Sequence, residues 1–339
     1  MTPLKEKFGF PLFTKTSTKV YLGDHKKLVI ADIWPFWDYV IKKKSGANKA
    51  FMKALLEQAQ NFYISAEKSP IQSKPLLYYY SFLNLAKIII NLERNYGESS
   101  IYMHGMKEKN NGKFSRSEVI LQKKKQTLKN VACELMEVID NTTHTADITL
   151  NVKELLQQCV GIHRSYSEIY NQKEIFFKLY APTLIQHGTR MIYEGELKCS
   201  VEEKNNLIQV GYNVLEENNS MIYRCEIQTQ KQNKTRLDYF TLSSKLRDEG
   251  LWYFVSNDGY VMYLSSLNTN RYSPESIIYN TMFYLGSITR YHPYLFDKIF
   301  SDKEQWLMSE FLITQPKQFL YLVTAKSLGQ YVLKAYSSF

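Results

Sequence analysis

Two histidines and one arginine are the residues of this sequence whose types and positions suit acid–base chemistry on an anionic ligand. His104 precedes Gly105 at the start of a basic segment, and His292 lies two residues after Arg290 in "TRYHPYLF". An imidazole titrates near neutral pH, and a guanidinium offers an anion a planar fork of donors. We therefore take His104 and His292 as candidate catalytic residues. The alternative is that both cap and pack at turns.

A hydrophobic stretch with an unusual polar stripe, "SKPLLYYYSFLNLAKIIINLERNYG", spans residues 73–97. Four polar residues interrupt its middle: Ser81, Asn84, Lys87 and Asn91. On a helical wheel they fall within about 120° of one another. The stripe faces solvent in one interpretation, and in the other it faces the C-terminal helices, where Asn84 and Lys87 neutralise a phosphate. We take Asn84, Lys87 and Arg290 as candidate anion-binding residues.

The charge of the chain favours an anionic partner. The formal net charge is +10, although a lysine-rich composition alone is the plainer explanation. The segment "HGMKEKNNGKFSRS" concentrates cations, and the chain is rich in aromatics, with 26 Tyr and 18 Phe. Single-strand-binding proteins combine cationic grooves with stacking aromatics. The candidate nucleic-acid-binding residues are Lys107, Lys109, Lys113 and Arg116.

Several common site motifs are absent from the sequence. It contains no G-x-x-x-x-G-K-[ST], G-x-G-x-x-G, G-x-S-x-G or H-E-x-x-H, and its four cysteines have no metal-site spacing. We therefore expect neither a cofactor nor a metal. The N-terminus has no signal-peptide pattern, and the longest apolar stretch is too interrupted to span a bilayer. These features predict a cytoplasmic protein with reduced thiols and no membrane contact.

The elements that must position these residues predict an α+β fold. We expect a helical bundle, built from the N- and C-terminal segments, with an antiparallel β-sheet region inserted between them. The predicted regions are an irregular segment (1–47), a helical region (48–180), an antiparallel β region (187–267) and C-terminal helices (273–339) that pack with 48–180. Period-two patterns predict strands at "TRMIYEGELKCSV", "NLIQVGYNVL", "SMIYRCEIQTQ", "RLDYFTLSS" and "LWYFVSNDGYVMYLSSL".

Helix boundaries also have sequence signals. Ser73 is the expected N-cap of the tyrosine-rich helix, with Pro75 in its first turn and Gly97 at its end. Ser273 and Pro274 predict the start of another helix. Near the C-terminus, a capping box at Ser301 and Glu304 and a later proline, Pro316, predict the starts of two further helices.

Two family resemblances follow from quoted segments. "SKPLLYYYSFLNLAKIII", the His104–Gly105 pair and "YNTMFYLGSITRYHPYLFDKIFSDKEQWLMSEFL" resemble the YaaC-like family of bacterial proteins. This resemblance implies a cytoplasmic protein without a settled activity, and it raises a role in anti-phage defence. The helix "YYSFLNLAKIIINLERNYG" with the following "HG" also resembles HEPN helical bundles. Many HEPN proteins are ribonucleases with an R-x(4–6)-H motif, which this sequence lacks.

Three functions are compatible with the sequence. The first is a binding component for RNA, DNA or a protein encoded by a neighbouring gene. The second is a ribonuclease or nucleotide-processing enzyme with a non-standard site. The third is a structural partner whose tyrosine-rich face forms a homo-oligomer.

Overall fold

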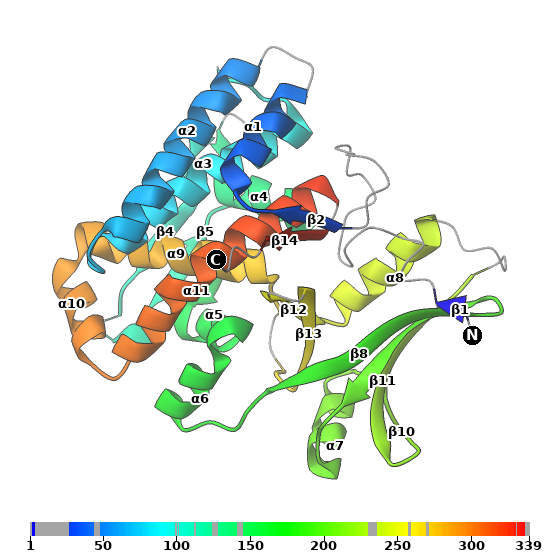
Figure 1. Cartoon of the computed structure of the whole chain (residues 1–339). Coiled ribbons are helices and arrows are strands. Elements are labelled where there is room, and N and C mark those ends of the chain that lie inside the picture. The colour runs from blue at the N-terminus through cyan, green and yellow to red at the C-terminus, as the bar shows by residue number, and fades with distance from the viewer. Residues whose placement is uncertain are drawn as a thin grey trace. The chain divides into compact units, whose positions relative to one another are not determined.

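The computed structural model describes most of the chain, in two compact units (Figure 1). The described residues are 2–3, 27–43, 48–98, 100, 102–111, 113–123, 128–140, 145–229, 236–256, 259–268, 271–329 and 331–335. We call Ile30–Gln172 with Ser273–Leu320 the helical unit, and Met1–Val29 with Lys173–Tyr272 and Tyr321–Phe339 the sheet unit. Most of the segment predicted as irregular, 4–26 and 44–47, lies outside the described residues.

The helical unit contains long helices and a few short strands. Its helices are α1 (Ile33–Lys43), α2 (Lys49–Lys68), α3 (Lys74–Arg94), α4 (Val131–Asp140), α5 (Val152–Gln157), α6 (His163–Tyr170), α9 (Pro274–Tyr291), α10 (Pro293–Ser301) and α11 (Gln305–Leu328) up to Leu320. Its 3₁₀ helices are η1 (Phe114–Arg116) and η2 (Val160–Ile162). Strands β4 (Met106–Lys109), β5 (Glu118–Leu121) and β7 (Ile148–Asn151) form an antiparallel sheet, and β3 (Tyr102–Met103) pairs in parallel with β6 (Lys129–Asn130).

Helix α3 is the centre of the helical unit, as its apolar sequence predicts. Helices α2, α4 and α9 pack against it (Figure 1). Phe82 is fully buried and stacks on Phe319 of α11, with 4.1 Å between ring centroids. At Gly286 of α9, an added Cβ would lie 3.2 Å from the Cβ of Tyr79. Because Gly286 has no side chain, α9 can approach α3 closely at Tyr79.

The start of α3 agrees with the sequence signals, and its end does not. Ser73 occupies the N-cap position but its side chain makes no capping hydrogen bond, while Pro75 lies in the first turn as expected. The helix ends at Arg94 with Asn95 as its left-handed C-cap (φ 53°), so Gly97 is not the cap. Asparagine tolerates this conformation better than other side-chain-bearing residues, which lets the helix stop before the glycine.

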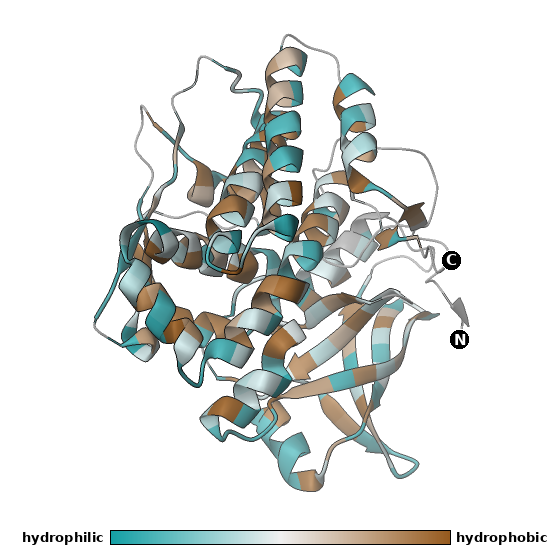
Figure 2. Ribbon diagram, turned by 60° about the vertical axis from the view of Figure 1, so that its left-hand side comes forward, coloured by the Kyte–Doolittle hydropathy of each residue, from teal (hydrophilic) through white to brown (hydrophobic). Residues whose placement is uncertain are grey.

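The sheet unit is organised around a seven-stranded antiparallel sheet. Its strands are β1 (Thr2–Pro3), β8 (Phe176–His187), β9 (Arg190–Leu197), β10 (Val214–Glu217), β11 (Ser220–Gln228), β12 (Trp252–Ser256) and β13 (Gly259–Ser265). The order is β10-β11-β9-β8-β13-β12, with β1 also pairing with β8. Strand β14 (Tyr331–Lys334) pairs with β2 (Lys27–Ile30). Hydrophobic residues, brown in Figure 2, are interspersed with polar residues along the strands of the larger sheet. The α+β fold class is confirmed.

One predicted strand is wrong and another is wrong in its first half, because helices form there, although Val214 and Leu215 at the end of "NLIQVGYNVL" do begin β10. Helix α7 (Val201–Gln209) takes the first part of "NLIQVGYNVL", and a capping box between Ser200 and Glu203 starts it. This box satisfies the free N–H groups of the first turn and favours helix. Helix α8 (Arg236–Asp248) contains "RLDYFTLSS". Its buried residues Tyr239, Leu242 and Leu246 recur at helical spacing, not at alternate positions.

The C-terminal helices also differ from prediction. Ser273 caps α9 as expected, accepting a hydrogen bond from the Ser276 N–H. Ser301 instead ends α10 and donates to the Asp297 carbonyl, so the capping box with Glu304 is wrong. Helix α11 continues through Pro316 as one helix, because buried side chains on both sides of the proline hold it in the core. Within the described residues, no helix combines the length and hydrophobicity that crossing a membrane requires.

Candidate functional site

The polar stripe of α3 faces neighbouring elements of the helical unit and not solvent. Ser81 is fully buried and donates to the Ala59 carbonyl of α2 at 2.7 Å. The Asn84 amide donates to the side-chain oxygen of Gln58, also on α2. The Asn91 amide donates to the hydroxyl of Tyr102 on β3 at 2.8 Å, and its oxygen accepts from the Gly97 N–H in the turn after the helix. The solvent-facing interpretation is therefore wrong for these three residues, whose polar groups fulfil buried hydrogen bonds.

Lys87 is the exception within the stripe. It is half-buried, and its ammonium group lies 5.6 Å from the centre of the Tyr102 ring. Burial lowers the pKa of Lys87 below its ordinary value. Asn84 was expected to bind an anion together with Lys87, but its amide is hydrogen-bonded to Gln58 on α2. Lys87 is therefore the member of the stripe that remains for an anion.

A tight turn holds His104 at the end of β3. Gly105 adopts a left-handed conformation (φ 77°), and a Cβ there would lie 1.7 Å from the side-chain oxygen of Asn130. That oxygen accepts a hydrogen bond from the Cys133 N–H at the start of α4. The His104 carbonyl accepts from the Ala132 N–H of the same helix. The sequence "HG" therefore has a local structural cause, since only glycine fits beside Asn130.

His104 is bound to the central helix through Tyr79. The Tyr79 hydroxyl and Nδ1 of His104 are 2.6 Å apart, and the two rings stack with centroids 5.6 Å apart. Tyr79 is itself buried against Phe283 and Tyr279 of α9. Burial raises the pKa of Tyr79 well above its ordinary value, so its hydroxyl stays protonated.

Arg290 completes a cationic cluster around His104. It is exposed at the end of α9, and its guanidinium donates to the Tyr80 hydroxyl at 2.9 Å. Burial lowers the pKa of His104, and the positive charges of Lys87 and Arg290 lower it further. The structure thus brings together Lys87, His104 and Arg290, which lie far apart in the sequence. We call these three residues with Tyr79 and Tyr80 the His104 cluster.

His292 faces a different partner. Its Nε2 lies 3.6 Å from a carboxylate oxygen of Glu108 on β4, and the side chain is exposed. Arg290 donates to Tyr80 instead, so the two side chains have different partners although they lie two residues apart. His292 lies at the turn between α9 and α10, as the alternative interpretation expects, but its side chain makes no capping hydrogen bond.

The basic segment after His104 contains two regular elements, β4 and η1, and ends one residue before β5. Lys109 forms an ion pair with Glu118 at 2.8 Å, which leaves it less available to a ligand. Lys107 and Arg116 are exposed. Lys113 lines a pocket together with residues of α10.

Tyr79 and Tyr80 are the members of the cluster that sequence reasoning missed. Tyr80 lies seven residues before Lys87, which is two turns of helix and the same face. That spacing was a usable signal, because it places the hydroxyl on the face of the polar stripe. Tyr79 gave no signal, because a tyrosine on the apolar side of a helix is most simply a core residue. Among the described residues, no group of His, Cys, Asp and Glu side chains is arranged to hold a metal ion.

Comparison with known proteins gives one family. A family model described as YaaC-like Protein matches residues 15–326. No curated protein and no solved structure matches the chain. The match covers both units and all residues of the His104 cluster.

Proposed function

The chain belongs to the YaaC-like family, and from that premise and the His104 cluster we propose that its helical unit binds single-stranded nucleic acid. The observation that carries the proposal is a pair of exposed tyrosines beside an exposed arginine. Tyr291 is 59% exposed and Tyr294 is 84% exposed, and the Arg290 guanidinium lies 4.9 Å from the Tyr291 ring centre. Exposed aromatic rings next to cations are the means by which proteins hold unpaired bases and their phosphates.

The charges around His104 favour a phosphate group. Lys87 and Arg290 lie close enough to His104 for their positive charges to lower its pKa. Arginine binds phosphate oxygens through two parallel hydrogen bonds, and the nearby ammonium group of Lys87 adds a positive charge. His104 and Arg290 both remain exposed, so the cluster is open to a long polymer. Lys107, which is exposed on β4 three residues after His104, supplies a further cation for the backbone.

The test measures binding of fluorescent single-stranded RNA and DNA by anisotropy over a series of salt concentrations. Each phosphate contact adds about 0.7 to the slope of log affinity against log salt for a single strand. Lys87→Ala with Arg290→Ala should therefore lower the magnitude of the slope by about 1.4. Lys53→Ala, at an exposed site on α2, is the matched control and should bind as the wild type does.

A separate variant tests how much stacking on an aromatic ring contributes to strand binding. Tyr294→Ala should weaken binding by about 1–3 kcal/mol while leaving the salt slope unchanged, because stacking releases no counterions. The proposal fails if the wild type shows no salt-sensitive binding, or if the double variant retains the wild-type slope. In that event a protein partner or a homo-oligomer becomes the better hypothesis. Light scattering after size exclusion detects a homo-oligomer when the protein is run alone, and a complex when it is run with a candidate partner.

Acid–base catalysis on the bound strand is the second candidate, and the bond between Tyr79 and His104 favours it. A neutral imidazole fixed by a hydroxyl at 2.6 Å is oriented for proton transfer. Incubation of end-labelled RNA with the protein distinguishes the two functions. Recovery of intact strand supports binding alone, whereas cleavage that is lost in His104→Gln supports catalysis.

A further inference from the structure

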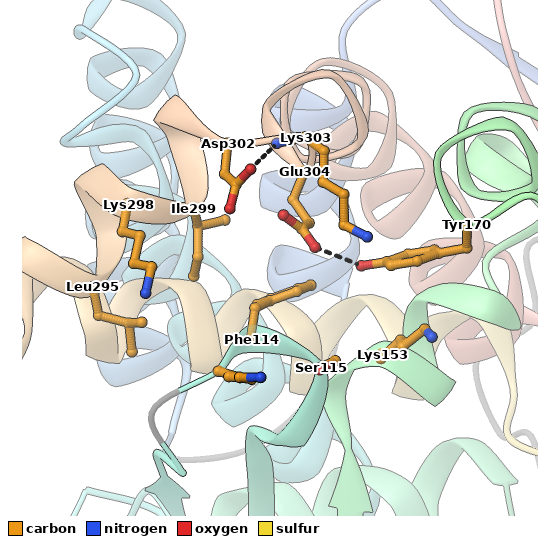
Figure 3. A pocket seen from close by; sticks show the side chains of 11 residues that line it. Phe114, Ser115, Lys153, Tyr170, Leu295, Lys298, Ile299, Asp302, Lys303 and Glu304 are labelled. Carbon is orange, nitrogen blue, oxygen red and sulfur yellow. Dashed lines mark hydrogen bonds between the residues drawn. The ribbon is translucent and has the colours of Figure 1, made fainter.

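A second cationic site lies in the helical unit, in a pocket of about 360 Å³. Its walls come from η1, from α10 and the turn that follows it, and from single residues of α5 and α6. Ligand pockets for small molecules begin at about 300 Å³. Figure 3 shows Phe114 in the middle of the lining, with Lys298 and Leu295 on one side and Tyr170 on the other.

Positive charge predominates in the pocket. The lining contains four lysines, Lys113, Lys153, Lys298 and Lys303, and two carboxylates, Asp302 and Glu304. With all six groups ionised, four positive and two negative charges leave a formal charge of +2. In the described part of the chain, none of these four ammonium groups forms an ion pair. Four unpaired ammonium groups at one pocket repel one another, and an anion relieves that repulsion.

Both carboxylates accept hydrogen bonds from other residues of the lining. Glu304 is buried and accepts a hydrogen bond from the Tyr170 hydroxyl at 3.2 Å (Figure 3). Asp302 accepts from the backbone N–H of Lys303 at 2.8 Å. Each carboxylate is therefore held within the wall of the pocket by a neutral donor and not by one of the four ammonium groups.

The pocket also offers apolar and aromatic surface. Phe114 and Ile299 are buried side chains of the lining. The Tyr170 ring lies 4.2 Å from the ammonium group of Lys153 and 5.0 Å from that of Lys303. These two lysines rest on the ring at cation–π distances, so they are held near the pocket without a counter-ion.

We propose that this pocket binds a small phosphorylated molecule with a flat apolar body, of the size and charge of a nucleoside monophosphate. The phosphate carries a charge of about −1.5 to −2 at neutral pH, which matches the excess of lysines. The apolar lining, with Phe114 and Ile299, suits the base. This site goes beyond the proposed strand-binding function, because it shares no residue with the His104 cluster.

The experiment is isothermal titration of the full-length protein with AMP, GMP, CMP and UMP, with adenosine and inorganic phosphate as partial ligands. At least one nucleotide should bind more tightly than either partial ligand, since both halves of the pocket then contribute. Lys298→Ala and Lys303→Ala should each weaken nucleotide binding about tenfold, the cost of one hydrogen bond to a charged group. Lys317→Ala, an exposed lysine of α11 outside the pocket, is the matched control.

Two further measurements keep the proposal falsifiable. Asp302→Asn keeps an oxygen for the Lys303 N–H but removes a negative charge, so it should tighten nucleotide binding by several-fold. A 5′-phosphorylated oligonucleotide separates a strand end from a free nucleotide, and it should compete more weakly than AMP. Absence of nucleotide binding, or affinities unaffected by Lys298→Ala and Lys303→Ala in variants with unchanged melting temperature, would overturn the proposal. Strand binding should be unchanged in both variants, so each proposal can fail alone.

Discussion

The Tyr79 hydroxyl lies 2.6 Å from Nδ1 of His104, which ties the central helix of the helical unit to the turn at the end of β3. One partner is a core residue and the other belongs to an exposed turn. The position of the imidazole therefore depends on how Tyr79 packs between α3 and α9. The same contact makes His104 the best-positioned of the candidate site residues, because its ring is both stacked and hydrogen-bonded.

The first prediction separates the hydroxyl of Tyr79 from its ring. Tyr79→Phe should lower the free energy of unfolding by about 1 kcal/mol, the net value of one hydrogen bond. Tyr79→Ala should cost about 3–5 kcal/mol, because it also empties the space against Phe283. Urea denaturation measures both. Tyr39→Phe, on an exposed tyrosine, is the control and should have no measurable effect, while equal costs for Phe and Ala at position 79 would contradict the prediction.

The second prediction concerns the charges around His104. Lys87→Met and Arg290→Met should each raise the pKa of His104 toward the ordinary histidine value, because each removes a positive charge that disfavours protonation. The double variant should raise it further. NMR titration of the imidazole measures the pKa directly. An unchanged pKa in all three variants would show that burial alone sets it.

The third prediction is a pH dependence of stability with a defined sign. An imidazole whose pKa is lowered by folding binds fewer protons in the folded state than in the unfolded one. Its contribution to stability is therefore complete above the ordinary histidine pKa of about 6.5 and is lost as the pH falls below that value. His104→Gln should remove this part of the decline in the free energy of unfolding as the pH falls below about 6.5. His187→Gln, at an exposed site on β8, should leave the decline in place, and equal curves for both variants would contradict the assignment.

Helix α3 was predictable because its hydrophobic residues are nearly continuous and only one bundle position accepts such a helix. The wheel also grouped Ser81, Asn84, Lys87 and Asn91 correctly on one face. It could not show that α2 covers most of that face, because a wheel carries no information about neighbouring elements. The outcome is that Ser81 and Asn84 bond to α2, while Lys87 alone carries charge on that face.

The contacts that assemble the site were beyond sequence patterns, because they join distant segments. Tyr80 meets Arg290 across 210 positions, and Tyr170 meets Glu304 across 134. The strands predicted where α7 and α8 lie are a different kind of error. Local sequence signals for helix were present there, but the residues were read with the two-residue period of a strand. For α7, the Ser200 and Glu203 pair was a capping box in the sequence, and it outweighs a short alternating pattern.

The last prediction tests the glycine that places His104. Gly105→Ala should lower the free energy of unfolding by about 2–4 kcal/mol, from the left-handed backbone and from loss of the Asn130 cap on α4. Gly188→Ala is the matched control, because Gly188 is also left-handed but has no atom within 4 Å of an added Cβ. It should cost about 1 kcal/mol, the backbone term alone.

The difference between the two variants isolates the collision with Asn130. Urea denaturation gives that difference, and NMR of His104 shows whether the imidazole has moved from Tyr79. If Gly105→Ala costs no more than Gly188→Ala, Asn130 rotates away freely and the turn does not fix His104. If it costs more and the His104 signal shifts, the turn positions the imidazole, and strand binding should weaken in the same variant although no cation has been removed.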